Sequence, residues 1–350
     1  MAGAPGAAID AERRAALNAA KLAALVSARW GERDYRRRPF AGGAALTGPG
    51  EDGAPTAWLL VGERPERSLG PALLWAEREG ADRLHVIADD ATGVLARQAA
   101  LFAGPVPEVW RIGHTSLHRA DPEPLVPPAT APAPPELVDL LLDAGLEVVV
   151  EGGVVRGEVN GLEVARIVSG TTTAGVPIDA PQLEVGVGKA DRELTAMLHG
   201  ELAPVDQLGR VLEIVRRHRR PGAARHPLNQ LVPERWLRAV LCREPTVVGL
   251  TTLEPAQGAR PRPNLTARDI AVGQGRTDDG APVVVACSVG GALDLVPEAA
   301  DARAAIDPDA HLLLAVPERD DLPGNRRLAA RLRSPAEVAP VPGDWPALGR

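Results

Sequence analysis

The chain has 350 residues, of which 45% are hydrophobic and 24% charged, and its formal net charge is −7. This hydrophobic content excludes disorder over the whole length, and the acidic balance argues against a protein wholly devoted to coating nucleic acid. Aromatic residues make up only 3% of the chain, so the core must be built mainly from Val, Leu, Ile and Ala.

Two cysteines, Cys242 and Cys287, are too few for a disulfide framework and do not lie at a metal-binding spacing. The amino-terminal residues lack the basic start and apolar centre of a signal peptide. No apolar run approaches the roughly 20 residues that span a bilayer. We therefore expect a soluble, cytoplasmic protein with no membrane partner, and the sequence leaves its oligomeric state open.

The first predicted element is an amphipathic helix over residues 11–30. Leu17, Leu22, Leu25 and Val26 fall on one stripe of this helix, which is the pattern of a face packed on a core.

Short apolar strands and helices then alternate in two separate runs. Residues 57–112 predict a β-α-β-α-β module, and residues 283–341 predict the same order over nearly the same length. Because parallel neighbours need a crossover connection, each module predicts a parallel sheet. An internal duplication or coincidence would explain the similarity equally well.

We therefore predict an α/β protein with mixed or mostly parallel sheets, in which the two modules flank a central, acidic, strand-rich segment. Seven prolines among residues 121–135 predict an extended linker. The predicted segments are an N-terminal α/β module (1–120), the Pro-rich linker (121–135), a central α-β core (136–200), an Arg-rich helical segment (201–254) and a C-terminal α/β module (255–350).

Single acidic residues recur along the apolar strands predicted between residues 146 and 187. They are Glu151, Glu158, Glu163 and Glu184, and the last strand ends at a glycine turn that holds Lys189. Several carboxylates beside a Gly-Lys turn would suit a metal or phosphate site. An ordinary sheet with solvated rims would produce the same pattern, and the glycines and Asn beside Glu151 and Glu158 are typical of such rims.

A helix at 136–144, acidic strands and a helix at 190–199 resemble the core of the PD-(D/E)XK nuclease superfamily. The resemblance implies nucleic acid as the substrate and a divalent metal such as Mg²⁺ as the cofactor. The catalytic residues that it implies are Glu158, Glu163, Glu184 and Lys189.

The chain departs from that family at the motif lysine, which lies two residues after a strand Glu. Ala165 and Gly186 occupy the two positions where this lysine is expected. Lys189 lies five residues after Glu184, so on a continuous strand it would point to the opposite face. The resemblance therefore implies a displaced lysine or an inactive descendant. Taken whole, the sequence also resembles uncharacterised proteins of GC-rich actinobacteria, which implies no activity.

Glu163 poses a specific problem for the fold. Period two places Glu163 on an apolar strand face with Ala165 and Ile167, and it directs Arg166 to the other face. An unpaired buried carboxylate costs several kcal/mol. We therefore expect Glu163 to have a partner or to lie at an edge.

The glycine turn before residue 190 has the strand, loop and helix order of a phosphate cradle. It lacks the GxxxxGK[ST] motif because Ala190 follows Lys189, and it lacks GxGxxG because Asp191 stands at the last position. Asp191 and Glu193 would themselves stabilise the helix start. A capped turn is therefore the alternative interpretation.

Residues 210–243 contain nine arginines but only two acidic residues, Glu213 and Glu234. This excess predicts either an anion-binding patch or a solvated helix pair that faces the protein's own acidic surface. The arginines predicted to bind an anion are Arg216, Arg217, Arg219, Arg220 and Arg225.

Loops that follow the strands of the two modules form another candidate ligand site, since open parallel sheets bind ligands beyond the carboxyl ends of their strands. These loops cover residues 62–67, 88–90, 287–291 and 317–321 and are rich in Arg and acidic residues. The histidines form no metal-binding pair, and we assign no residue to a metal.

Three functions remain open. We favour a non-catalytic binding or interaction protein that uses its Arg-rich helices against nucleic acid or another anionic partner. The alternatives are a nuclease-like protein, active or inactive, and a nucleotide or small-ligand binding protein.

Overall fold

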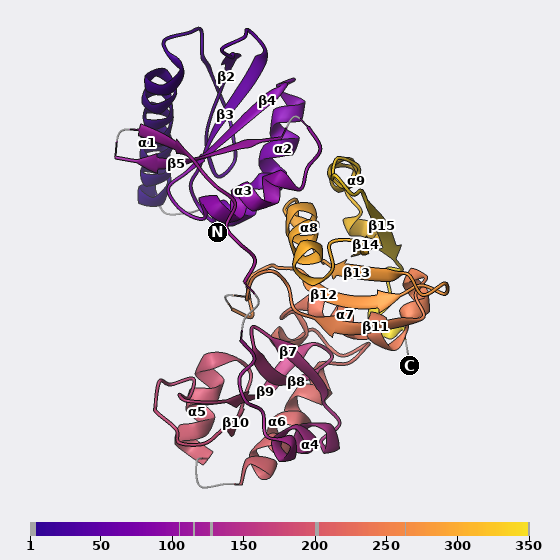
Figure 1. Cartoon of the computed structure of the whole chain (residues 1–350). Helices are drawn as coiled ribbons and strands as arrows, with labels where there is room; N and C mark the ends of the chain where they lie inside the picture. Colours follow the sequence, from indigo (N-terminus) through magenta and orange to yellow (C-terminus); the bar gives the residue numbers. More distant parts are fainter. Residues whose placement is uncertain are drawn as a thin grey trace. The chain divides into compact units, whose positions relative to one another are not determined.

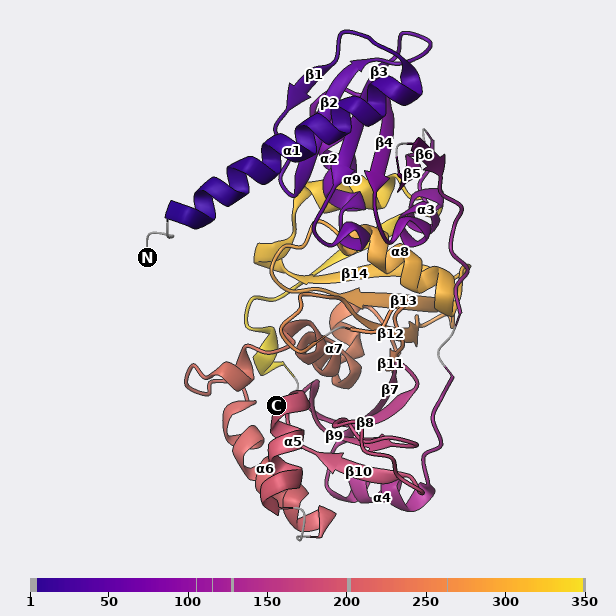
Figure 2. The same cartoon turned by 90° about the vertical axis from the view of Figure 1, so that its left-hand side faces the viewer.

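The computed structural model describes residues 5–104, 106–114, 116–126, 129–199, 203–262 and 264–348. This part of the chain is an α/β protein with three sheets (Figures 1 and 2). Within it, no helix has both the length and the apolar character that crossing a membrane requires. Contacts between residues divide the chain into unit 1 (Met1–Pro124, Val296–Asp301 and Pro323–Pro335) and unit 2 (Leu125–Leu295, Ala302–Leu322 and Ala336–Arg350).

Unit 1 contains a six-stranded sheet in the order β1-β2-β3-β4-β5-β6. Strands β3, β4 and β5 are parallel, and the other pairings are antiparallel. The strands are β1 (Arg36–Arg38), β2 (Gly43–Pro49), β3 (Pro55–Val61), β4 (Arg83–Ala88), β5 (Glu108–Gly113) and β6 (Ser116–Arg119). The helices are α1 (Pro5–Trp30), α2 (Leu69–Arg78), α3 (Thr92–Ala100) and α9 (Pro323–Ala330), with part of α8 (Leu295–Ile306).

The predicted amino-terminal helix is confirmed and forms the last part of α1. Leu22, Leu25 and Val26 are buried in a core cluster with apolar residues of the sheet, as their stripe predicts. Leu17 was predicted on the same stripe, but it is 72% exposed. The sheet contacts of α1 thus involve its second half, where α1 lies against β2 and β3 (Figure 2).

Unit 2 contains two sheets. One is an antiparallel four-stranded sheet in the order β10-β9-β8-β7, and the other is a five-stranded sheet in the order β11-β12-β13-β14-β15. The strands of the first are β7 (Glu147–Glu151), β8 (Val154–Val159), β9 (Leu162–Val168) and β10 (Gln182–Val185). Those of the second are β11 (Thr252–Ala256), β12 (Ala271–Arg276), β13 (Pro282–Cys287), β14 (His311–Pro317) and β15 (Ala336–Val341). The other helices are α4 (Pro135–Asp143), α5 (Gly188–His199), α6 (Pro204–His218) and α7 (Pro233–Arg243).

Two tight turns set the register of β7, β8 and β9. Gly152 and Gly153 connect the first pair of strands, and Asn160 and Gly161 connect the second. All four residues have positive φ angles, as a two-residue hairpin turn of type I′ requires, and Asn-Gly is a favoured sequence for that turn.

The two parallel regions share one arrangement. Apart from single-turn helices, the first module has the order α1-β1-β2-β3-α2-β4-α3-β5, and the second has the order α7-β11-β12-β13-α8-β14-α9-β15. In each module an antiparallel strand pair precedes three parallel strands, and the sheet order follows the chain. The predicted similarity of residues 57–112 and 283–341 is therefore confirmed in element order, and it extends to the preceding helix and two strands.

The predicted α/β class and the mixed sheets are confirmed, but the alternative of mostly parallel sheets is wrong. Parallel pairing is confined to β3-β4, β4-β5, β13-β14 and β14-β15 among the named strands. Each crossover helix produces one parallel pairing, whereas every tight hairpin produces an antiparallel one. In the predicted linker, residues 121–126 and 129–134 form neither helix nor strand.

Gly161 provides a test of the packing between the β8-β9 turn and α7. A Cβ atom at Gly161 would lie 2.3 Å from the backbone carbon of Arg235, whereas a Cβ at Gly170 would meet nothing within 4 Å; both glycines have positive φ. We expect Gly170→Ala to lower the free energy of unfolding by about 1 kcal/mol through backbone strain. Gly161→Ala should cost about 1–3 kcal/mol more, because the backbone of α7 must move. Urea denaturation of both variants measures this difference, and equal losses would contradict the predicted clash.

Candidate functional site

Two carboxylates of unit 2 lie opposite each other on neighbouring strands. The ladder between β8 and β9 pairs Glu158 with Glu163, and each residue is only 1% exposed. Like charges on directly opposite residues disfavour strand pairing, and burial adds a large desolvation cost. Both carboxylates therefore need nearby positive charge.

Helix α7 supplies the positive charge for Glu158. Arg235 Nη1 lies 3.3 Å from Glu158 Oε1, and Arg238 Nη2 lies 3.0 Å from Glu158 Oε2. The two arginines are three residues apart, so they share one face of the helix. Both are buried. The expectation that Glu158 lies on a solvated rim was therefore wrong.

Glu163 has three arginine partners. Its Oε1 atom accepts from Arg166 Nε at 2.6 Å and from Arg192 Nη1 at 2.9 Å. Its Oε2 atom lies 3.1 Å from Arg156 Nη1. The expectation that Glu163 requires a partner is confirmed. These partners come from β9 itself, from the neighbouring strand β8 and from α5.

Arg166 was expected on the opposite strand face, and that expectation was wrong. The ladder passes from Gly157–Ala165 to Glu158–Glu163, so Val164 is an extra residue in β9. Such a bulge interrupts the alternation of side chains along a strand. Glu163 and Arg166 consequently meet although three residues separate them.

These pairs form one continuous network. Arg235 also pairs with Glu151, and Arg156 lies 3.8 Å from Glu151, which links the two buried carboxylates through shared arginines. Arg192 extends the network to Glu184 at 3.8 Å. Glu184 also accepts from the backbone N–H and the hydroxyl of Thr173.

The pKa values of the carboxyl groups in the network shift in different directions. Burial alone would raise the pKa of Glu163, but Arg156, Arg166 and Arg192 outweigh it and hold the pKa below the ordinary value of 4.5. The pKa of Glu151 is also lowered, because Arg235 and Arg156 outweigh the effect of burial. At Glu158 burial dominates and raises the pKa despite Arg238 and Arg235.

The structure brings together three of the residues implied by the nuclease resemblance but not the fourth. Glu158, Glu163 and Glu184 belong to the network, whereas the Lys189 side chain is 70% exposed and its Nζ lies 3.8 Å from Glu193. Asp191 accepts from the backbone N–H of Val187 at 2.6 Å. This contact is the one that the capped-turn interpretation predicts.

Metal binding would require carboxylate oxygens that are free of guanidinium groups. Among the described residues, no group of three or more His, Cys, Asp and Glu side chains is arranged to hold a metal ion. The thiols offer no reactive alternative, since burial raises the pKa of Cys242 to about 11 and also raises that of Cys287. A thiol is nucleophilic only as the thiolate.

The arginines predicted to bind an anion lie in different environments. Arg219 is 1% exposed, and its guanidinium donates to backbone carbonyls of Asn160, Leu228, Leu231 and Val232. It therefore stabilises the interior. Arg216, Arg217, Arg220 and Arg225 are exposed.

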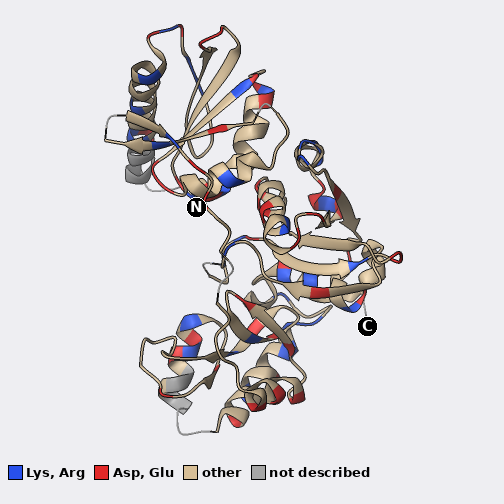
Figure 3. Cartoon of the chain, in the orientation of Figure 1, with Lys and Arg blue, Asp and Glu red and all other residues tan. Residues whose placement is uncertain are grey.

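Two of the exposed arginines have partners within the protein. Arg216 donates to the carbonyls of Ala144 and Gly145, just after α4, and Arg217 forms an ion pair with Glu213 at 3.1 Å. Arg220 donates to the backbone carbonyl of Arg217 and has no carboxylate partner among the described residues. Figure 3 shows both charge signs distributed over the strands and helices of this unit.

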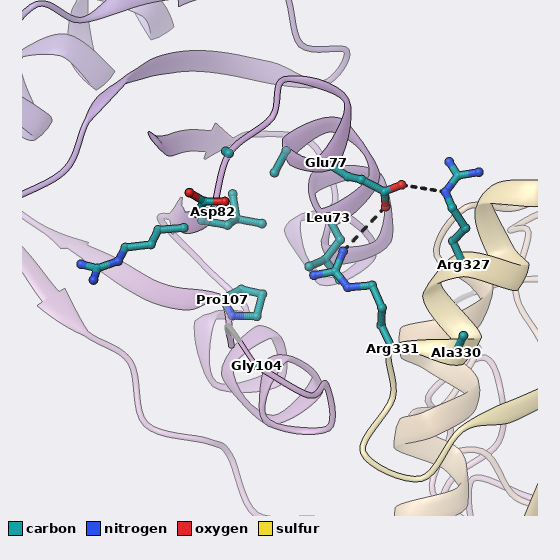
Figure 4. Close-up of a pocket in the computed structure, with 12 residues that line it drawn as sticks. Leu73, Glu77, Asp82, Gly104, Pro107, Arg327, Ala330 and Arg331 are labelled. Atoms are coloured by element: carbon teal, nitrogen blue, oxygen red, sulfur yellow. Dashed lines mark hydrogen bonds and ion pairs between the residues drawn. The ribbon is translucent and has the colours of Figure 1, made fainter. Parts of the chain in front are cut away.

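A separate pocket of about 600 Å³ lies in unit 1 beside α2, the start of β4 and α9 (Figure 4). Leu73, Pro107 and Ala330 contribute apolar walls. Glu77 lies between Arg327 and Arg331, with N–O distances of 2.7 Å and 3.8 Å. The pocket lies at the amino end of β4, not at the carboxyl end where the sequence predicted ligand binding, and its arginines are used internally.

Comparisons with protein families, with characterised proteins and with solved structures found no match to this chain. Sequence reasoning identified Glu163 but missed its partners Arg156 and Arg192 and the partners of Glu158. One signal in the sequence could have found them: a buried carboxylate needs a positively charged partner, and in an Arg-rich chain that partner is expected to be an arginine. The signal does not say which arginine.

Replacing one buried carboxylate tests the structural role of the network. We expect Glu163→Gln to lower the free energy of unfolding by about 3 kcal/mol, because it leaves buried guanidinium charge uncompensated. Glu193→Gln removes a carboxylate from an exposed pair and should change stability by less than about 0.5 kcal/mol. Urea denaturation checks both values. A Glu163→Gln loss as small as that of Glu193→Gln would contradict the role assigned to the network.

The lowered pKa of Glu163 makes a prediction about pH. A carboxyl group whose pKa is lower in the folded state stabilises the fold above its unfolded pKa. This contribution is lost as the pH falls through the folded value. The stability difference between wild type and Glu163→Gln should therefore be constant near neutral pH and shrink below about 4.5. Urea titrations between pH 7 and pH 3 measure it, and a difference that stays constant in acid would refute the ionised pairing.

Proposed function

We propose that the protein is a non-catalytic binding protein that uses an exposed arginine surface of unit 2 to bind an anionic partner. This surface comprises Arg210, Arg217, Arg220 and Arg225, and we call it the α6 arginine surface. Nucleic acid is the partner to test first, because its phosphates are regularly spaced anions that arginine binds readily.

The observation that carries the proposal is that some arginines of residues 210–243 are buried and paired, whereas others are exposed and have no carboxylate partner among the described residues. Arg219, Arg235 and Arg238 are buried and paired inside the protein. Arg210 and Arg225 are exposed, and neither has a carboxylate partner among the described residues. Of the α6 arginine surface, Arg210, Arg220 and Arg225 are therefore available to an external anion, whereas Arg217 has an ion pair with Glu213.

A histidine pair holds the surface together. The rings of His218, at the end of α6, and His226 are stacked with their centroids 3.7 Å apart and their planes 13° apart. This contact holds the loop after α6 against the end of the helix, and Arg217 and Arg225 each precede one member of the stacked pair. Arg210 lies seven residues before Arg217, so the two share a helix face.

The alternatives have less support. The nuclease-like interpretation remains a prediction, but its carboxylates already serve as partners of buried arginines. A capped turn at Lys189 and internal pairing of Glu77 likewise leave no set of free catalytic groups in the described sites. We therefore favour binding without catalysis.

Charge removal tests the proposal. Arg210→Gln/Arg220→Gln/Arg225→Gln should weaken binding to a labelled single strand in fluorescence anisotropy. Each lost phosphate contact should reduce the slope of log K against log salt by about 0.7. The matched control is Arg36→Gln/Arg37→Gln/Arg78→Gln, which removes the same charge from exposed positions of unit 1. Absence of wild-type binding at about 50 mM salt, or equal weakening in both variants, would overturn the proposal.

A further inference from the structure

Unit 1 contains a pocket that none of the sequence patterns indicated. It has a volume of about 480 Å³, and its walls include Trp30, Trp58, His85 and Trp110. This volume lies within the usual range of small-molecule sites, about 300–1,000 Å³. The whole chain has only six tryptophans, so half of them line this one pocket.

The rings form a connected cluster. His85 stacks on Trp58 with centroids 5.7 Å apart and planes 16° apart, and it lies 4.7 Å from Trp30. Trp30 meets Trp110 edge to face at 5.3 Å. All four rings are buried, with Trp58 0% and the others 6–8% exposed, so the cluster forms an apolar floor beneath the pocket rather than a set of open ring faces.

The second module shows that this aromatic set is not needed to form the fold. The third pair in the β3-β4 ladder is Trp58–His85, whereas the third pair in the β13-β14 ladder is Val285–Leu313. Trp58 packs in the core cluster that contains α1 residues, and Val285 packs in the corresponding cluster that contains α7 residues. The same strand positions are therefore aliphatic in the second copy, whose two tryptophans, Trp236 and Trp345, come from α7 and from the segment after β15.

Trp110 has a similar counterpart. It pairs with Ile87 of β4, and the equivalent residue Ala315 of β14 pairs with Ala339. Large rings at three neighbouring positions of one copy, against Val, Leu and Ala in the other, indicate a requirement beyond core packing. Binding of a ligand is a function that would impose it.

The pocket also carries positive charge. Arg29, Arg83 and Arg119 line it together with Glu51 and Glu108. Arg83 pairs with Asp52 at 2.5 Å. Arg29 is exposed and has no carboxylate partner among the described residues; its guanidinium lies 5.1 Å from the ring centre of Trp110.

His85 adds a hydrogen-bond donor. Trp110 Nε1 donates to His85 Nδ1 at 3.1 Å, so the neutral imidazole carries its proton on Nε2. The described residues offer no partner to this Nε2–H group. The neutral state is favoured because burial, together with Arg83, Arg29 and Arg119, lowers the pKa of His85 to about 4. The same arginines that disfavour the imidazolium would favour a bound anion.

We propose that this pocket binds a small planar aromatic or heteroaromatic anion. The ring would pack on the accessible parts of Trp30, His85 and Trp110, and the anionic group would pair with Arg29. A nucleoside monophosphate and an aromatic carboxylate share this chemistry. The site differs from the α6 arginine surface in position and in ligand.

Binding to the full chain can be followed by tryptophan fluorescence and thermal unfolding. The probes are AMP, indole-3-acetate and benzoate, with adenosine and inorganic phosphate as single-feature controls. We expect at least one planar anion to quench the fluorescence and raise Tm, and to bind at least about tenfold more tightly than either control. Stronger binding of AMP identifies the nucleotide class, and stronger binding of the carboxylates identifies the aromatic acid class.

Two variants separate recognition from folding. Arg29→Gln should weaken binding about tenfold or more through loss of a charged hydrogen bond, and Arg37→Gln, at an exposed position outside the pocket, should leave it unchanged. His85→Leu introduces the residue of the second module, so it should unfold cooperatively and lose binding. If His85→Leu does not fold, Arg29→Gln decides the question. The proposal is overturned if no planar anion binds at about 1 mM, if inorganic phosphate binds equally well, or if Arg29→Gln binds like wild type.

Discussion

Unit 2 depends on the compensation of two carboxylates that the β8-β9 ladder places opposite each other in the interior. Neither Glu158 nor Glu163 would tolerate burial without positive charge, and their mutual repulsion adds to that cost. Arginines from two strands and from two helices supply the charge. The ion pairs therefore link α5 and α7 to the β8-β9 pair, and α7 does so from its position on the five-stranded sheet.

This constraint explains how an acidic chain contains a strongly basic segment. Some of its arginines, such as Arg235, form ion pairs with buried carboxylates. Arg219 instead donates hydrogen bonds to backbone carbonyls. Others, such as Arg220 and Arg225, remain at the surface. One stretch of sequence thus provides internal compensation and an exposed positive surface. The network also engages Glu151, Glu158, Glu163 and Glu184, so each of these four carboxylates has an arginine partner.

The repeated module adds a comparison inside one molecule. Both copies pack a helix on the same face of a sheet that combines antiparallel and parallel pairing. At the equivalent strand positions one copy has Val285, Leu313 and Ala339, and the other has Trp58, His85 and Trp110. The first cluster also contains Trp236 of α7 and Trp345, which lie outside the strands. Because the two backbones are equivalent, a side chain that the fold requires should occur in both modules. A side chain that only ligand binding requires should occur in one of them.

The sequence by itself determined the features that depend on neighbours along the chain. Strand and helix periodicity predicted the two modules, and the carboxylate at Glu163 predicted a charged partner. Only the tertiary structure decided which arginines pair with which carboxylates, because the partners of Glu158 lie 77 and 80 residues away and Val164 changes the alternation beside Glu163. The aromatic pocket arose in the same way: its residues lie on α1 and on separate strands and come together only when the helix packs on the sheet. Local patterns follow from backbone geometry, whereas charge pairing and pockets depend on long-range packing.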